Sequence, residues 1–193
     1  MPGRDWHETI GRQLAELHCA TRQAWFGFHC DSYLGHMRQP NQPSEEWLQF
    51  WREQRLGWQL SLFAEKTDSG DRLLVLAEKL LSALEGLLTS VDEPAVLLHG
   101  DLWSGNLAAD ESGAPVIFDP ASYYGHREAE IGMMRLFGGF GSRCEAAYSQ
   151  VWPLAPGSER WIALYRLYHE LNHLNLFGRS YYRMCIETME SLL

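Results

Sequence analysis

The sequence predicts a mainly α-helical protein that carries one small β-hairpin close to the middle of the chain. Two observations lead to this fold class. Apolar residues recur at spacings of three and four over long stretches on both sides of the centre, which is the period of amphipathic helices. Between positions 96 and 120, by contrast, the apolar runs are only about three residues long and are separated by glycine, proline and polar residues. We therefore expect one lobe over 1–193, made of a helical part (5–95), a loop with a hairpin (96–120) and a helical bundle (121–193).

The first part is predicted to hold three helices and one long loop. Asp5 is placed to cap a helix that runs to about Thr21, and Ser44 to cap a helix that runs to about Lys66. A third helix is expected over 71–88, where leucines occupy one face. Residues 24–43 between the first two helices are rich in aromatic residues, glycine, asparagine and proline, and we expect an irregular loop there. A long loop in a compact domain is often functional.

The central stretch should begin with a buried strand and continue into the hairpin. Residues 96–98 form a short apolar run, and the polar sequence His99-Gly100-Asp101 follows at once. Two further strands are predicted at 107–109 and 116–118, joined by a turn through Ser112 and Gly113. Four more helices should complete the chain, at 127–137, 143–151, 157–177 and from Tyr181 onward.

Four polar residues in the central stretch have the order that phosphoryl transfer requires. His99, Asp101 and Asn106 follow the pattern H-x-D-x-x-x-x-N, and Asp119 comes just after the hairpin. Such a reaction needs a carboxylate beside the accepting hydroxyl, and an amide and a second carboxylate on magnesium. The alternative interpretation is that these short polar residues only cap turns and a helix. Because four residues match at the right spacing, we favour the catalytic loop.

Composition narrows the classes of partner. The formal net charge is −9 and no basic cluster is present, which argues against a nucleic-acid or anionic membrane surface. No apolar run approaches the length of a membrane span. The four cysteines are scattered and form no C-x-x-C pair, which argues against a zinc site and is typical of reduced thiols in a cytoplasmic protein.

Several motifs resemble one kinase family over almost the whole chain. The segments are HGDLWSGN, FDPASYYGHREAEIGM, LFGGF and LNHLNLFGRSYY, with GRQLAELH, FGFHCDSYLG and QPN before them. Together they resemble the fructosamine kinase (ketosamine 3-kinase) family, which belongs with the aminoglycoside and choline kinases and has a protein-kinase-like fold. Trp103 after the aspartate, and the sequence DPA after the hairpin, distinguish this family from those relatives.

The resemblance implies a role for each candidate residue. Asp101 would be the general base or orienting group for the accepting hydroxyl, while Asn106 and Asp119 would hold Mg²⁺ with ATP as the co-substrate. Trp103 would lie against the sugar-derived substrate, with packing as the alternative. Tyr124 and His126 could touch substrate, and loop 24–43 would face the cleft. His99 would brace the catalytic loop by hydrogen bonding, and Glu130 would either anchor the loop backbone or be a solvated carboxylate. Asn172 and His173 would be structural polar residues behind the site.

The chain also departs from a complete kinase. It has no G-x-G-x-x-G loop, and its lysines before Asp101, Lys66 and Lys79, both fall in predicted helices. The resemblance is therefore to the carboxy-terminal lobe, and we expect the amino-terminal lobe to be absent. Trp103 also stands where protein kinases often have a lysine.

Three functions are consistent with these features. The first is an ATP-dependent kinase for ketosamines, small or attached to glycated protein, that would serve repair. The second is a related aminoglycoside- or choline-type kinase. The third is a truncated, non-catalytic module. A lone lobe could pair with a separate lobe or with itself.

Overall fold

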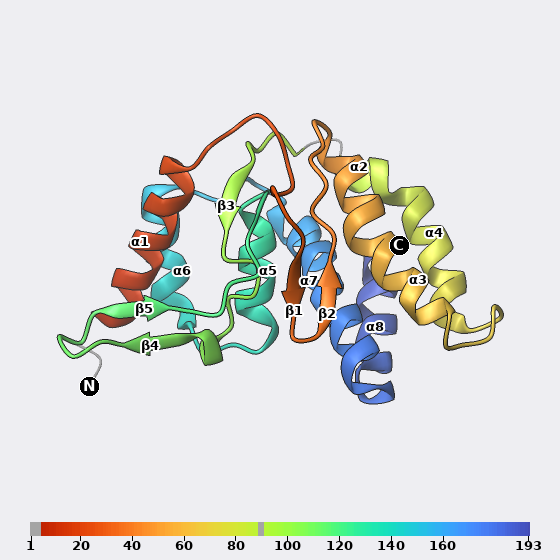
Figure 1. The fold of residues 1–193 in the computed structure, drawn as a ribbon. Helices are drawn as coiled ribbons and strands as arrows, with labels where there is room; N and C mark the ends of the chain where they lie inside the picture. The colour runs from red at the N-terminus through yellow and green to blue at the C-terminus, as the bar shows by residue number, and fades with distance from the viewer. Residues whose placement is uncertain (1–4, 89–90) are drawn as a thin grey trace.

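The computed structural model describes residues 5–88 and 91–193. Residues 1–4 and 89–90 of the predicted lobe lie outside the described residues. Helices make up most of the structure, so the prediction of a mainly α-helical fold is confirmed (Figure 1). The helices are α1 (Trp6–Ala20), α2 (Trp47–Trp51), α3 (Trp58–Ala64), α4 (Arg72–Leu88), α5 (Glu128–Leu136), α6 (Gly141–Val151), α7 (Ser158–Phe177) and α8 (Tyr182–Leu192), with a π-helical segment (Arg52–Gly57) between α2 and α3 and single 3₁₀ turns at Ser104–Asn106 and Arg179–Tyr181.

In residues 5–88 and 91–193, six short strands form three separate antiparallel pairs, where the sequence predicted one hairpin and a single buried strand end. The pairs are β1 (Ser32–Leu34) with β2 (Met37–Gln39), β3 (Val96–Leu98) with β6 (Tyr123–Gly125), and β4 (Leu107–Ala109) with β5 (Pro115–Ile117). The β1–β2 pair corrects the prediction of an irregular loop at 24–43. Strands of three residues are too short to show an alternating pattern, which explains why this pair was missed.

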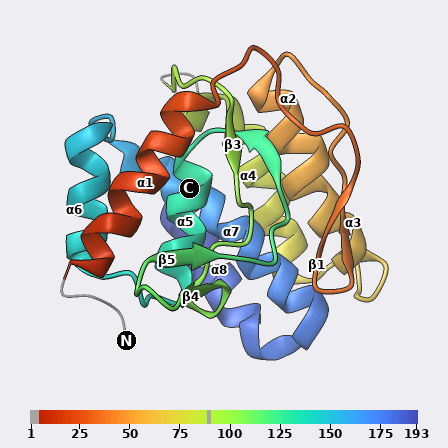
Figure 2. The ribbon, with the colours of Figure 1, turned by 60° about the vertical axis from the view of Figure 1, so that its left-hand side comes forward.

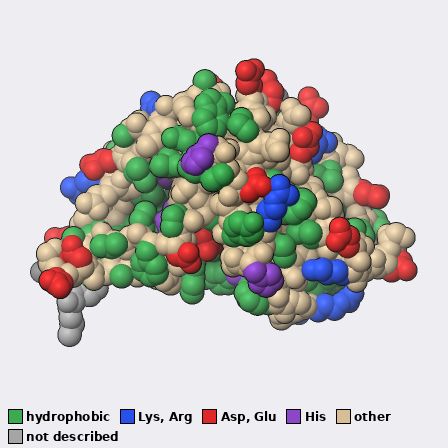
Figure 3. Space-filling model, in the orientation of Figure 1, with side chains coloured by type: hydrophobic (Ala, Val, Ile, Leu, Met, Phe, Trp, Pro, Cys, Tyr) green, Lys and Arg blue, Asp and Glu red, His purple; other side chains and the backbone are tan. Residues whose placement is uncertain are grey.

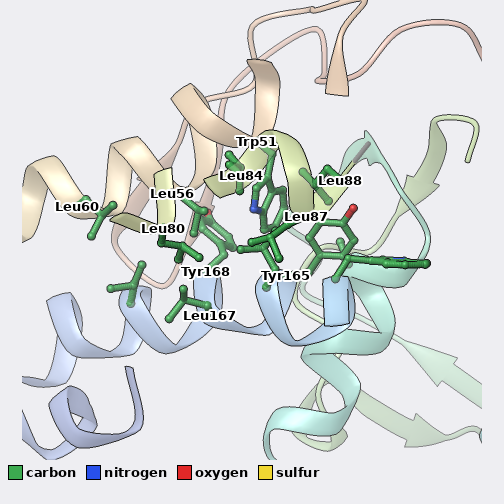
Figure 4. Close-up of a cluster of buried hydrophobic side chains, with 14 of the residues drawn as sticks. Trp51, Leu56, Leu60, Leu80, Leu84, Leu87, Leu88, Tyr165, Leu167 and Tyr168 are labelled. Carbon is green, nitrogen blue, oxygen red and sulfur yellow. The ribbon is translucent and has the colours of Figure 1, made fainter. Parts of the chain in front are cut away.

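The main core lies between the helical pair α2–α3, helix α4 and helix α7. Leucines of α4 point toward two buried tyrosines of α7, and Trp51 of α2 lies between them (Figure 4). Trp51, Leu84, Tyr165 and Tyr168 are essentially inaccessible to solvent. Burial of side chains of this size stabilises the fold by about 1.5–3 kcal/mol each. This cluster therefore holds α7 firmly against α2, α3 and α4.

A second, smaller core joins α1 to α5 and α6. Helices α1 and α6 lie side by side in both ribbon views (Figures 1 and 2). The close approach depends on Gly11, because a Cβ atom there would collide with the backbone carbonyl of Cys144. Leu102, which follows Asp101, is fully buried in this cluster. The second core therefore supports the central loop from one side.

Two predicted helix caps differ from the structure. Asp5 occupies the N-cap position of α1, but its side chain makes no capping hydrogen bond. The helix after Ser44 begins only at Trp47, and the hydroxyl of Ser44 instead accepts a hydrogen bond from the backbone N–H of Glu46. The Ser44 side chain thus forms a local turn before the helix, as serine often does.

The surface and the cysteines complete the description. On the face shown in Figure 3, the described acidic side chains are widely spread, while Lys and Arg form small separate groups. None of the helices within the described residues is long and apolar enough to cross a membrane. The four cysteines all lie in the described part of the chain and are unpaired.

Candidate active site

The predicted catalytic loop leaves β3 and turns back toward the β4–β5 hairpin. Asn106 closes this turn: its backbone N–H donates to the carbonyl of Trp103 (2.9 Å), and its side-chain Nδ2 donates to the carbonyl of Asp101 (2.9 Å). The same Nδ2 lies 3.3 Å from Oδ2 of Asp101. These bonds hold the Asp101 carboxylate and leave Oδ1 of Asn106 available as a ligand atom.

His99 joins the start of the loop to the strand that precedes Asp119. Its Nδ1 accepts a hydrogen bond from the backbone N–H of Asp101 (3.3 Å), so its proton lies on Nε2, which donates to the carbonyl of Phe118 (2.9 Å). Burial lowers the pKa of His99, although the Phe118 carbonyl and the charge of Asp119 oppose this shift. A buried, neutral His99 therefore braces the two segments that carry Asp101 and Asp119.

Glu130 on α5 holds the backbone of the same loop from behind. Its carboxylate is buried and accepts hydrogen bonds from the N–H groups of His99 (2.5 Å) and Gly100 (3.1 Å). Burial raises the pKa of Glu130 to about 7, and the two N–H donors offset part of that rise. The sequence left open whether Glu130 anchors the loop backbone or is a solvated carboxylate. In the structure Glu130 is buried and is bonded to the loop backbone.

Asp119 follows the hairpin in a left-handed backbone conformation. Its φ angle is 56°, and Asp119 is the one non-glycine residue of the described chain with positive φ. Aspartate tolerates this region better than most residues, but the conformation is still unusual. Strained backbone of this kind clusters at functional sites. Here it turns the chain directly after β5 and places the side chain beside Asp101.

Asp101, Asn106 and Asp119 line one pocket of about 430 Å³. The prediction that the two carboxylates face a common cleft is thereby confirmed. Burial raises the pKa of Asp101 to about 7, the charge of Asp119 adds to the rise, and the hydrogen bond from Asn106 opposes it. Carboxylate and amide oxygens are the ligands that Mg²⁺ prefers, and this ion usually takes few protein ligands together with substrate phosphates. The donor set therefore fits a magnesium–nucleotide complex.

Aromatic side chains also line this pocket. Trp103 is 39% exposed, and its ring lies across Gly105, where a Cβ atom would collide with the indole. Phe137, which directly follows α5, makes edge contacts with Trp103 and with His173, at centroid distances of 6.1 Å and 4.9 Å. The wall consists of Trp103, Phe137, His173, Phe177 and Tyr181. We call this set the aromatic wall.

Two residues expected behind the site in fact line it. Asn172 and His173 both border the pocket, and Nδ1 of His173 donates to the carbonyl of His169 (2.8 Å). The unprotonated Nε2 of His173 is therefore an acceptor. The signal that could have identified them is the helical spacing of 172, 173, 176 and 177, which places all four on the side of α7 that borders the pocket.

Two predicted substrate residues lie elsewhere. His126 is 3% exposed, stacks on Trp47 (4.3 Å between centroids) and hydrogen bonds through Nδ1 with the hydroxyl of Tyr165 (3.0 Å). It borders a different pocket, with Trp47 and Glu93, so the structure does not bring it to Asp101. Tyr124 is half-buried on β6, pairs with Leu97 and packs on Trp25, and it does not line the Asp101 pocket either. Burial of β6 against the core explains both positions.

Comparison with known proteins places the chain in a family. The family model described as fructosamine kinase matches residues 2–193. A candidate ketoamine kinase of Vibrio parahaemolyticus is 44% identical over 184 residues, covering 95% of this chain and 62% of that protein. A chloroplastic protein-ribulosamine 3-kinase of Oryza sativa (subsp. japonica) is 42% identical over 191 residues, covering 95% of this chain and 54% of that protein. The chain thus spans between about half and two thirds of these relatives' length.

A solved structure agrees in fold. The crystal structure of a candidate fructosamine-3-kinase from Thermobifida fusca superimposes with a TM-score of 0.90 and 35% identity, over 100% of this chain and 66% of that one. This likeness confirms the predicted kinase-like fold. Because the family model covers nearly every residue, including the loop that carries Asp101, Asn106 and Asp119, the chain belongs to the fructosamine kinase family.

Proposed function

We propose that the Asp101 pocket serves magnesium- and ATP-dependent transfer of a phosphoryl group to a hydroxyl of a ketosamine. The observation that carries this proposal is the convergence of Asp101, Asn106 and Asp119 on one pocket that faces the aromatic wall. Phosphoryl transfer depends mainly on positioning and on offsetting charge, and not on covalent participation of the protein. A pocket with two carboxylates and an amide meets these needs.

Asp101 is assigned to the accepting hydroxyl. Nδ2 of Asn106 donates to both the carbonyl and the carboxylate of Asp101, which fixes the carboxylate relative to the loop. A fixed carboxylate can accept the hydroxyl proton and orient the oxygen for in-line attack. Glu130 and His99 contribute indirectly, because Glu130 accepts hydrogen bonds from the backbone of the two residues before Asp101, and His99 links the N–H of Asp101 to the carbonyl of Phe118.

Asn106 and Asp119 are assigned to magnesium. Oδ1 of Asn106 and the carboxylate of Asp119 are hard oxygen donors that border the same pocket. Bound Mg²⁺ would neutralise phosphate charge during transfer. No lysine or arginine lines this pocket within the described residues. The relatives extend beyond the matched region, and we propose that in those proteins the unmatched part holds the phosphate loop and the lysine that kinases of this type use.

The aromatic wall favours a ketosamine as the acceptor. A sugar ring offers an apolar face that packs on an indole, and the protonated amine of a ketosamine is attracted both by aromatic faces and by the carboxylates of the same pocket. Trp103 and Phe177, 39% and 63% exposed, are open to such contacts. The name of the rice relative, protein-ribulosamine 3-kinase, supports the 3-hydroxyl of a protein-bound sugar as the target. Phosphorylation there would destabilise the adduct and so repair glycated protein in the cytoplasm.

The test is phosphate transfer from magnesium–ATP to a panel of acceptors. The chain would be assayed alone and joined to the part of the Vibrio parahaemolyticus relative that lies outside the match. We expect the joined protein to phosphorylate fructosyl-lysine and ribosyl-lysine and to leave choline and kanamycin unmodified. We expect the chain alone to bind magnesium–ATP only in the millimolar range, about −4 kcal/mol, by isothermal titration. Transfer to choline or kanamycin in preference to the sugar amines would contradict the proposed acceptor class.

A further inference from the structure

Arg55 is a buried arginine that does not line the Asp101 pocket. Its side chain is fully inaccessible to solvent, and it forms no salt bridge with a carboxylate in the described residues. It belongs to the π-helical segment Arg52–Gly57 that interrupts the helix formed by α2 and α3. π-Helical turns are rare and often occur at functional sites, and a buried charge is costly unless its donors are used.

The surroundings of Arg55 compensate for its charge with aromatic faces and carbonyl oxygens. The guanidinium lies over the rings of Tyr123 (4.0 Å) and Phe50 (4.5 Å). One Nη donates to the carbonyl of Pro40 (2.6 Å), and the other donates to Oδ1 of Asn41 (2.8 Å). Both bonds reach the segment that directly follows β2. The planar fork of arginine can make them together, which the single ammonium of lysine cannot do in the same geometry.

Asn41, which Arg55 holds in place, and Gln39 form hydrogen bonds that connect the two strands of the β1–β2 hairpin at its base. Nδ2 of Asn41 donates to the carbonyl of Cys30 (3.1 Å) and to Oγ of Ser32 (3.0 Å). Nε2 of Gln39 donates to the same Oγ of Ser32 (2.7 Å). Gln39 and Asn41 are themselves buried. The base of the hairpin is thus held by side-chain bonds, while the hairpin has only three residue pairs of its own.

The hairpin base is also tied to the segment that carries Asp119. Nε2 of Gln39 donates to the carbonyl of Ala121 (2.9 Å), and the N–H of Ala121 donates to the carbonyl of His99 (2.9 Å). The hydroxyl of Tyr168 on α7 donates to Oε1 of Gln39 (2.8 Å). At the other end of the hairpin, Leu34 and Gly35 line the Asp101 pocket. One hydrogen-bonded series therefore connects Arg55 with the pocket wall and with the metal-binding segment.

From this series we infer that Arg55 is a positioning residue for the acceptor substrate. It fixes the β1–β2 hairpin over the Asp101 pocket, so that Leu34 and Gly35 form the wall that the acceptor meets. Arg55 touches neither substrate nor metal in this role. The inference deepens the proposed function and rests on it for the identity of the acceptor, but the anchoring of the hairpin can be measured without any acceptor.

The test compares Arg55→Lys with Arg38→Lys. Arg38 lies in the same hairpin but is exposed and pairs with Asp31 at the surface, so its replacement by lysine is the matched control. Amide hydrogen exchange is measured over residues 32–39 and over α7. We expect exchange of the hairpin to rise about 10-fold in Arg55→Lys, with α7 unchanged, and to stay at the wild-type rate in Arg38→Lys.

The kinetic arm uses the joined protein that transfers phosphate. We expect Arg55→Lys to raise KM for fructosyl-lysine about 5- to 10-fold, while kcat and KM for ATP change by about 2-fold or less. Should Arg55→Lys fail to fold, Asn41→Ser removes the same anchorage and should give the same pattern. Equal exchange in the two lysine variants, or faster exchange of α7 and hairpin alike, would overturn the inference. If the wild type transfers no phosphate, the proposed function fails, and the exchange experiment still decides the role of Arg55.

Discussion

The Asp101 pocket and the cluster around His126 are both built from polar and aromatic side chains, but they differ in their exposure to solvent. The Asp101 pocket holds Asp101, Trp103, Asn106 and Asp119 and opens to solvent. The histidine cluster, formed by Phe26, Trp47, His126 and Tyr165, borders a separate pocket but consists of buried side chains. Trp103 is 39% exposed, whereas His126 is 3% exposed.

Strand pairing accounts for the difference. Residues 123–125 pair with β3 and are covered by the core, so the segment that leads to His126 is carried inside. Residues 101–106 instead turn away from β3 without joining a strand pair: Leu102 and Asn106 are buried there, while Asp101 and residues 103–105 stay at least partly accessible. Both segments contain polar and aromatic residues. The segment at 123–126 belongs to a buried structural cluster because its strand pairs with β3, whereas the unpaired segment at 101–106 forms part of the site. The experiments below separate the two clusters by asking whether each substitution changes chemistry or stability.

Asp119→Asn should cause a large loss of turnover with little loss of stability. The variant keeps the shape of the side chain but loses the charge that offsets Mg²⁺, so magnesium-dependent turnover should fall by about 100-fold or more. The temperature of unfolding should change little, since Asp119 lies at the edge of an open pocket. Turnover is measured as a function of magnesium concentration in the joined protein. A variant with wild-type magnesium dependence would place the metal elsewhere.

His126→Ala should show the opposite behaviour. Removing a buried ring that stacks on Trp47 and bonds to Tyr165 should lower the free energy of unfolding by about 2–4 kcal/mol. KM for the acceptor should stay within about 2-fold of wild type, because the structure keeps His126 out of the Asp101 pocket. Urea unfolding followed by tryptophan fluorescence gives the first value. A stable variant with a raised acceptor KM would return His126 to the substrate site.

Because His126 is buried, the free energy of unfolding should depend on pH. Burial lowers the pKa of His126 to about 3, so below its ordinary pKa of 6.5 the unfolded chain binds a proton that the folded chain does not. This histidine therefore contributes stability above about pH 6.5 that is lost as the pH falls toward 3, by about 1.4 kcal/mol per pH unit.

His126→Phe keeps the aromatic stack and removes the titrating group. Relative to this variant, wild type should lose about 2 kcal/mol of stability between pH 6.5 and 5. The measurement is urea unfolding of both proteins at these two pH values. Parallel loss of stability in wild type and variant would mean that His126 is not neutral in the folded state.

The smallest expected effect is that of Trp103→Ala. Loss of the exposed indole should raise KM for the ketosamine about 10-fold, which corresponds to about 1.4 kcal/mol, and change the free energy of unfolding by less than about 1 kcal/mol. Trp103→Phe is the control, because it keeps an aromatic face and should retain most of the affinity. A large loss of stability with unchanged KM would identify Trp103 as a packing residue.

The sequence was informative where spacing determines position. Helix α4 begins one residue after its predicted start, where Asp71 accepts from the N–H of Leu73, and it continues to Leu88, the last described residue before position 89. The order of Asp101, Asn106 and Asp119 was sufficient to predict their convergence, because a loop and a short hairpin return the chain to its starting point. Local sequence could specify these features, since each depends on residues within about twenty positions.

Features that depend on distant partners were not predictable in the same way. The pairing of β3 with β6 joins residues 98 and 123, and it decided that His126 is buried. The role of Arg55 depends on Pro40 and Asn41 of a loop with no strand signal, and on Tyr123 far along the chain. The sequence predicts His173 behind the site, and the prediction is wrong because the position of His173 depends on how α7 packs beside α5. Tertiary packing, and not local pattern, determines these features.

The central claim is that the Asp101 carboxylate orients the hydroxyl that receives the phosphoryl group. The direct measurement is the rate of phosphate transfer from magnesium–ATP to fructosyl-lysine by the joined protein and by its Asp101→Asn variant, with nucleotide affinity measured in parallel. We predict that turnover falls by about 10²- to 10⁴-fold in the variant while its affinity for magnesium–ATP stays close to that of wild type. Equal turnover in the two proteins would contradict the account.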